Sequence, residues 1–234
     1  MSEWAMKRFW KTASFAPKDS GYEVHLDGRP VKTPAKRPLI LPTGDMACQV
    51  ALEWDAQEET VNPAIMPWTR SANAAIDKVA TQRQEVTAHL ASYAETDLVC
   101  YRAEGPESLI ERQNEAWDPL LDWIGEKYGA RLILASGVMP VAQSSTDLDR
   151  LAATMRGMSA FQLTGFYDLV TLTGSFVLAL AATESRENPE ALWAHSRVDE
   201  LWQIEQWGED EEAAEHAELK KTAFFHAISF FKAA

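Results

Sequence analysis

The chain has 234 residues and a formal net charge of −13, from 35 acidic and 22 basic side chains. This balance argues against nucleic acid as the main partner, because binding to phosphates depends on clustered Lys and Arg. Hydrophobic residues make up 46% of the sequence and include 9 tryptophans. Because that content can fill a core, the composition argues against a disordered chain.

The cysteines and the apolar runs indicate where the protein works. Cys48 and Cys100 are far apart and form no CxxC motif, which argues against a disulfide framework or a zinc site and suggests a reducing compartment. The start, "MSEWAMKRFWK", has no apolar signal region. The longest apolar run, 169–182, is short for a membrane span. We expect a soluble, cytoplasmic protein without stable membrane insertion.

Residues 7–42 have the texture of a small β unit. Tyr22, Val24 and Leu26 alternate with polar residues, a period of two that predicts a strand. A turn is predicted at "DGRP", and short strands cut off by proline are predicted at "RPVKTP" and "RPLILP". We therefore expect a small N-terminal antiparallel β domain over residues 1–42.

From Thr43 onward the patterns are helical. Thr43 is a predicted N-cap, followed by apolar residues at Met46, Val50 and Trp54. Further helical patterns follow at about 68–95, 107–128, 147–158, 160–184 and 189–207, and a last one ends near Lys232. Only 129–137 could be a later strand. The expected fold class is α+β, with a larger, mainly helical domain over residues 43–234.

No catalytic loop motif is present. The sequence contains neither GxxxxGK[ST] nor GxSxG. We expect "TLTGSFVLALA" (171–181) to form a buried helix in which Gly174 allows the close approach of a neighbouring helix. The Ser175 hydroxyl should then be buried and bonded to the helix backbone.

The histidines show no metal-binding pattern. None of the five lies three or four residues from another, and Glu212 and His216, four apart, are better interpreted as a solvated ion pair. We therefore expect no metal and no cofactor.

The stretch "VDELWQIEQWGEDEEAAEH" (198–216) carries two stripes at helical spacing. The first, expected to be buried, consists of Val198, Leu201, Trp202 and Glu205. The second alternates charge and bulk in the residues Glu200, Ile204, Trp207 and Glu211. An apolar centre with charged flanks is typical of a protein-binding surface. The alternative is a helix buried on two sides, and the acidic run 209–212 also suits a solvated helix start.

Other bulky and charged residues have simpler interpretations. Glu205, a carboxylate on the apolar stripe, is expected to pair with an arginine, such as Arg156 or Arg197, rather than to act in catalysis. Four tryptophans on apolar helical stripes are expected in the core: Trp54, Trp117, Trp123 and Trp193.

A resemblance then covers nearly the whole chain, from about Arg8 to Glu212. It rests on these segments, in order: "RFWK", "VHLDGRPVKTP", "LPTGDMACQVALEWDAQ", "MPWTRSANAAIDKV", "YAETDLVCYRAEGPESLIERQNEAWDPLLDW", "TLTGSFVLALA" and "VDELWQIEQWG". Together they resemble the assembly chaperones that bind the α subunit of the catalytic head of F-type ATP synthase. Without an Arg- and Ser-rich presequence, the chain is similar to the bacterial members.

The resemblance implies a function without catalysis. Family members hold the unassembled α subunit soluble until β subunits join it. The family's functional glutamates lie near "VDELWQIEQWG", which implies Glu200 and Glu211 as partner-binding residues, with Gln203, Ile204 and Trp207 beside them. For the acidic position after the tryptophan and glycine, Glu209 and Glu212 stay open beside Glu211.

Two other classes of function remain open. A small-molecule enzyme would use buried carboxylates such as Glu205, Asp97 and Asp118, and would show a pocket with converging polar groups. A general holdase would bind many unfolded clients without preference for the α subunit.

Overall fold

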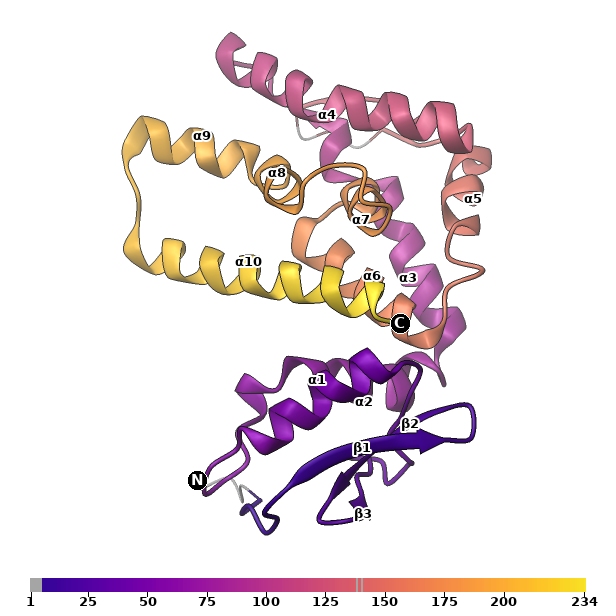
Figure 1. Ribbon diagram of the computed structural model, residues 1–234. Helices are drawn as coiled ribbons and strands as arrows, with labels where there is room; N and C mark the ends of the chain where they lie inside the picture. The colour runs from indigo at the N-terminus through magenta and orange to yellow at the C-terminus, as the bar shows by residue number, and fades with distance from the viewer. Residues whose placement is uncertain (1–5, 138, 140) are drawn as a thin grey trace. The chain divides into compact units, whose positions relative to one another are not determined.

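The computed structural model describes residues 6–137, 139 and 141–234 (Figure 1). These residues form two compact units. The first extends to Arg83 and includes Ser159–Gly165 and Ser229–Ala234. The second consists of Gln84–Met158 and Phe166–Ile228.

The first unit is built on an antiparallel sheet centred on β2. Its strands are β1 (Ala13–Lys18), β2 (Gly21–Leu26), β3 (Arg29–Pro30) and β4 (Ile40–Leu41). Strand β1 pairs with one edge of β2, while β3 and β4 pair with two different parts of the other edge. Asp27 and Gly28 form the turn between β2 and β3 with φ of 47° and 79°. Positive φ at both positions is the geometry of a two-residue hairpin turn, which confirms the predicted turn.

A helix covers this sheet and supplies much of the core. Helix α1 (Gly44–Asp55) packs on β1 and β2 (Figure 1). The predicted N-cap is confirmed, because the Thr43 side chain accepts a hydrogen bond from the Met46 amide at 3.3 Å. Met46 and Val50 are fully buried against Val24 of β2 and its neighbours. The unit also contains the 3₁₀ turn η1 (Pro63–Ile65), α2 (Pro67–Ala74) and the π-helical turn η2 (Ala75–Val79).

The change from strands to helices falls where the sequence places it, after residue 42. Because α1 packs on the sheet, the compact unit that contains the strands continues to Arg83. A division into independently folding domains 1–42 and 43–234 stays a prediction. The α+β fold class, a small N-terminal antiparallel sheet followed by a mainly helical region, is confirmed.

The second unit is mainly helical. Its elements are α3 (Arg83–Glu95), η3 (Leu98–Cys100), β5 (Tyr101–Arg102), α4 (Glu107–Tyr128), β6 (Ala135–Ser136), α5 (Ser145–Ala153), most of α6 (Ala160–Thr173), α7 (Phe176–Thr183), α8 (Pro189–His195), α9 (Val198–Trp207) and most of α10 (Glu211–Lys232). Strand β6 is the only strand among the described residues of 129–137, and it pairs in parallel with β5. The core gathers around α7, whose residues Phe176–Ala182 are all buried.

The expected single helix over 160–184 is two helices. Gly174 has φ of 68° and ends α6, and Ser175 then caps α7 by accepting a hydrogen bond from the Leu178 amide at 3.0 Å. A Cβ on Gly174 would meet nothing within 4 Å. The expectation that Gly174 allows close helix packing is therefore wrong. The glycine is needed for its left-handed backbone, whereas the buried, backbone-bonded hydroxyl of Ser175 is confirmed.

This backbone geometry predicts the cost of replacing Gly174. We expect Gly174→Ala and Gly174→Leu to lower the free energy of unfolding by similar amounts, about 1–2 kcal/mol, because strain at positive φ is common to both. Chemical denaturation of the two variants measures this. A much larger loss for leucine than for alanine would show that steric overlap, and not backbone strain, dominates.

Candidate functional site

The stretch 198–216 is not one helix. Helix α9 ends at Trp207, Gly208 follows with φ of 91°, and α10 begins at Glu211. Asp210 caps α10 by accepting a hydrogen bond from the Ala213 amide at 2.8 Å. Glu211 therefore begins a separate helix instead of continuing the stripe of Ile204 and Trp207. The expected helix over 189–207 is likewise divided between α8 and α9.

Helices α9 and α10 border an open cleft of about 590 Å³. Figure 1 shows the two helices side by side, joined by the short connection after Trp207. Four of the five predicted partner-binding residues line this cleft: Glu200, Gln203, Ile204 and Trp207. Glu211, the fifth, is not among the lining residues.

The apolar part of the cleft is unusually accessible. Leu201 is 42% exposed, Ile204 38% and Trp207 75%. The Trp207 ring makes a T-shaped contact with the Trp202 ring, with ring centroids 5.6 Å apart and planes at 87°. Trp193, which is buried, contributes from α8. Exposed side chains of this size in one concavity are typical of interaction sites.

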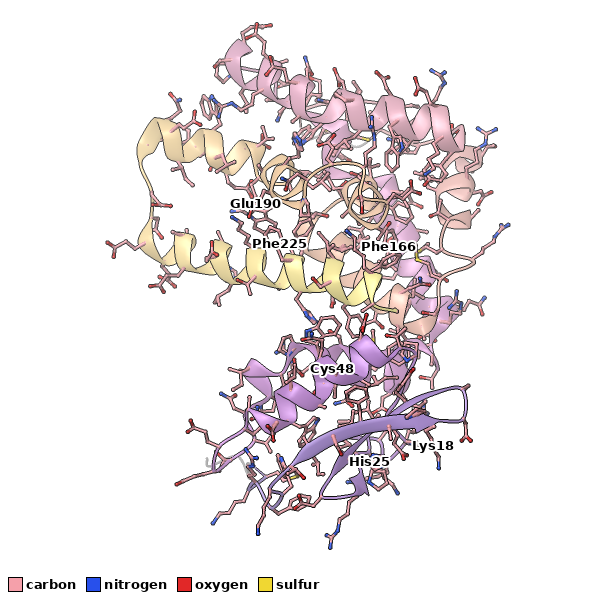
Figure 2. All side chains as sticks on the ribbon, viewed as in Figure 1. Lys18, His25, Cys48, Phe166, Glu190 and Phe225 are labelled. Atoms are coloured by element: carbon pink, nitrogen blue, oxygen red, sulfur yellow. The ribbon has the colours of Figure 1, made fainter. Side chains whose placement is uncertain are left out.

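The charged groups of the cleft are mostly acidic. Its lining includes five carboxylates against two cations, with the acids being Glu190, Glu200, Glu209, Asp210 and Glu218. The two cations are already paired: Arg197 lies 2.9 Å from Glu200, and Lys221 lies 2.8 Å from Glu190. Figure 2 labels Glu190, which lies on α8. The cleft thus presents an excess of negative charge to solvent.

The other side of α9 is held by α4. Arg112 donates two hydrogen bonds to the Glu205 carboxylate, each of 2.8 Å, and this bond holds the pKa of Glu205 below its ordinary value. The expected ion pair with an arginine exists, but the partner is Arg112, not Arg156 or Arg197. Both side chains are exposed. Of the stripe expected to be buried, only Val198 is, whereas Trp202 is half-buried and Leu201 and Glu205 are exposed.

Two partly buried hydrogen bonds from α4 hold the base of α9. The Trp117 indole N–H of α4 donates to the His195 carbonyl oxygen at 2.8 Å, at the end of α8. Gln113, also on α4, donates from its amide to the Asp199 carboxylate at 2.7 Å, at the start of α9. The direction of α9 therefore depends on α4.

The opposite wall of the cleft was not recognised from the sequence. Ala213, Ala214, Ala217 and Lys221 of α10 line it, at the spacing of one helical face. The signal was available as small residues at i, i+1 and i+4 in "AAEHA", but the acidic residues between them favoured a fully solvated helix start.

The three glutamates among which the sequence leaves the choice open lie at different places. Glu209 lines the cleft, whereas Glu212 lies with His216 along a shallower depression of α10. On a helical wheel Glu211 falls at the flank of the face that carries Ala214. Glu212 and His216 are both exposed, as expected, but the expected ion pair between them is not among the ion pairs of the described residues.

The expected core tryptophans divide into two groups. Trp117 and Trp193 are buried, as predicted. Trp54 and Trp123 are half-buried. Trp54 contacts the buried Trp10 in the first unit, with centroids 5.3 Å apart.

The carboxylates of the enzyme alternative do not converge. Asp97 is fully buried, Asp118 pairs with Arg102 at 2.7 Å, and Glu205 pairs with Arg112. Asp97 accepts hydrogen bonds from the Val99 and Val177 amides at 3.2 and 3.0 Å, and so caps η3 and the start of α7. Each carboxylate has a structural partner of its own.

Asp97 predicts a pH dependence of stability. Burial, opposed by hydrogen bonds from Ser175 and three backbone amides, raises its pKa from 3.8 to about 6. A raised pKa means that the folded chain holds this proton more tightly than the unfolded chain. The contribution of Asp97 should be most favourable below about pH 4, fall by roughly 3 kcal/mol between about pH 4 and 6, and then stay level.

Asp97→Asn removes this titration. Urea denaturation of the parent and of the variant across pH 4–8 should show their difference in unfolding free energy moving against the parent up to about pH 6. The lost hydrogen bonds affect the variant at every pH. Only the slope of the difference in unfolding free energy against pH is therefore diagnostic. A difference that moves in favour of the parent as pH rises would mean that the amide donors outweigh burial.

Within residues 6–137, 139 and 141–234, no cluster of His, Cys, Asp and Glu has the arrangement of a metal site. No helix in the same described residues is both long and apolar enough to span a bilayer.

Fold and cleft together define a class: an α+β protein with an open, acidic and partly apolar surface cleft, and without converging catalytic carboxylates among its described residues. A family model described as ATP12 chaperone protein matches residues 7–125, and the chain belongs to this family. It is the family of ATP synthase assembly chaperones that the sequence motifs resemble.

Individual relatives support the same family assignment. The crystal structure of Atp12 from Paracoccus denitrificans is 43% identical, covers 98% of this chain and 99% of that chain, and has a TM-score of 0.93. A mutant of P. denitrificans Atp12p has the same identity and TM-score over 99% of each chain. "Protein atp12, mitochondrial" of Schizosaccharomyces pombe is 26% identical over 223 residues, which are 90% of this chain and 77% of the relative.

Proposed function

We propose that this chaperone binds the unassembled α subunit of the F-type ATP synthase catalytic head and keeps it soluble until β subunits join it. It does so as a binding protein, without catalysis or a cofactor, and in the bacterial cytoplasm. The observation that carries the proposal is the exposed apolar side chain of Trp207, which lies with Leu201 and Ile204 in a cleft with an acidic lining.

A cleft of this kind suits a temporary partner. An unassembled subunit exposes the apolar surface that its neighbour later covers, and such surface aggregates if left free. A few apolar anchors can shield it. Exposed carboxylates at the edge speed the encounter with a basic surface but add modest net affinity, so the client can still be released.

The binding residues in this proposal are Glu200, Gln203, Ile204, Trp207 and Glu211. Their positions relative to the cleft support these five residues to different degrees. The first four line the cleft, so they would contact a client held there. Glu211 lies outside the lining and would act only at the edge, where Glu209 is better placed.

Size-exclusion chromatography tests the proposal. The purified chain is mixed separately with purified α subunit, with β subunit and with an unrelated unfolded protein. We expect a complex with α alone. Equal capture of all three would indicate a general holdase, and turnover of nucleotide or another small molecule by the pure chain would overturn the non-enzymatic function.

A further inference from the structure

The two walls of the cleft are helix faces that do not cover each other. Ile204 and Trp207 of α9 are exposed, and none of residues 211–220 of α10 is buried. Apolar helix faces in water normally pack together or against a third element. Here α4 and the end of α8 hold α9 from the other side, so the space between the walls stays open.

Resting on the proposed function, we propose that the cleft takes one amphipathic, Lys- and Arg-bearing α-helix of the client. That helix docks between α9 and α10 and completes a three-helix arrangement. Helix-in-groove binding of this kind reads an apolar stripe at helical spacing. The client segment is therefore a pre-existing or induced helix, not an extended strand.

The shape of the walls fits a helix. Ala213, Ala214 and Ala217 keep the α10 wall low, and small residues let helix axes approach to about 8 Å. On the facing wall Ile204 and Trp207 supply bulky side chains that can enter the grooves of the incoming helix. Helix α9 has 10 residues, so the docked segment should be about three turns long.

The charges of the cleft indicate which side chains the docked helix should carry. Glu209 and Asp210, between α9 and α10, have no cationic partner in the described residues, while Arg197 and Lys221 are already paired. An incoming Lys or Arg would meet unpaired carboxylates. A second copy of this chain is a poor occupant, because its net charge of −13 opposes approach to an acidic cleft.

Filling the cleft tests the mode of binding. Ala217→Trp places a large ring on the α10 wall, and its matched control, Leu219→Trp, places the same ring on an exposed position that does not line the cleft. Ile204→Glu provides a second, independent block from α9. Thermal unfolding of each variant is measured first.

The probes are the whole α subunit and overlapping 20-residue peptides that cover its sequence. We expect the parent and Leu219→Trp to bind the α subunit and the same basic, amphipathic peptides. These peptides should gain helix by circular dichroism on binding, and their affinity should fall as salt rises. The two blocking variants should bind at least about 30-fold more weakly.

The possible failures are distinguishable. If the parent binds the α subunit and the folded blocking variants bind it equally well, the cleft is not the helix site and the inference is wrong while the proposed function stands. If the bound peptides are acidic or stay extended, the helical, basic occupant is wrong. If the parent does not bind the α subunit at all, the proposed function itself fails.

Discussion

Trp207→Ala is expected to weaken binding of the unassembled α subunit by about 30-fold or more while leaving the melting temperature almost unchanged. The side chain is 75% exposed and contacts the Trp202 ring in an edge-to-face geometry, so little native packing is lost. In a complex the same ring would be desolvated in the cleft, and truncation of a desolvated aromatic anchor typically costs about 2 kcal/mol or more. A binding titration with a parallel thermal melt measures both.

Glu209→Ala is the matched control for that variant. Glu209 lines the same cleft two residues away, but it is an exposed rim charge. Its loss should slow association and reduce the salt dependence with a smaller effect on affinity. Equal affinities of the parent and Trp207→Ala for the α subunit would remove the tryptophan from the interface.

Trp117→Ala should have the opposite profile, with a loss of about 3–5 kcal/mol in the free energy of unfolding. Trp117 is 1% exposed, donates its indole N–H to the His195 carbonyl oxygen, and stacks under the Arg102 guanidinium, which lies 5.2 Å from its ring centroid. Truncation would leave a cavity and an unpaired carbonyl at the base of α9. Chemical denaturation gives the value.

Trp117→Phe separates the two causes. It keeps most of the apolar volume but removes the indole donor, so we expect a smaller loss than for alanine, near the 1–3 kcal/mol of an unsatisfied buried polar group. If Trp117→Ala unfolds at the same denaturant concentration as the parent, α4 does not support α8 and α9 as described here.

Local sequence signals predicted much of the fold because the residues that give each signal also form the contacts that stabilise the element. Alternation at Val24 and Leu26 marked β2, the Thr43 hydroxyl marked the start of α1, and the helix expected over 107–128 is α4 itself. Two of the segments that carry the family resemblance are also joined by hydrogen bonds. Glu53, from one segment, accepts hydrogen bonds from the Trp68 and Thr69 amides of the next at 2.7 and 2.8 Å.

What sequence reasoning missed depends on backbone conformation and on distant partners. Gly174 and Gly208 both adopt positive φ and end helices, but a glycine within a helical pattern does not by itself show whether it bends, packs or terminates. The partner of Glu205, Arg112, is 93 residues away, and no local pattern points to it. Predicting that α10 forms a wall of the cleft required knowing that the chain reverses its direction after Trp207.

The candidate site was accordingly predicted in part. The spacing of Glu200, Ile204 and Trp207 identified one wall of the cleft, since all three lie on one face of a single helix. Glu211 was grouped with them because a helical wheel assumes unbroken helix. Gly208 interrupts that helix, so Glu209 and Asp210 take the places nearest the cleft.

The most direct test is amide hydrogen exchange of this chain with and without saturating α subunit. Amides of an open helix pair exchange through local unfolding, which a docked partner suppresses. We expect slower exchange to be concentrated in Glu200–Trp207 of α9 and in residues 211–221 of α10, with the sheet of the first unit unchanged. Protection confined to the sheet unit, with α9 and α10 exchanging as in the free protein, would contradict the assignment of the cleft as the binding site.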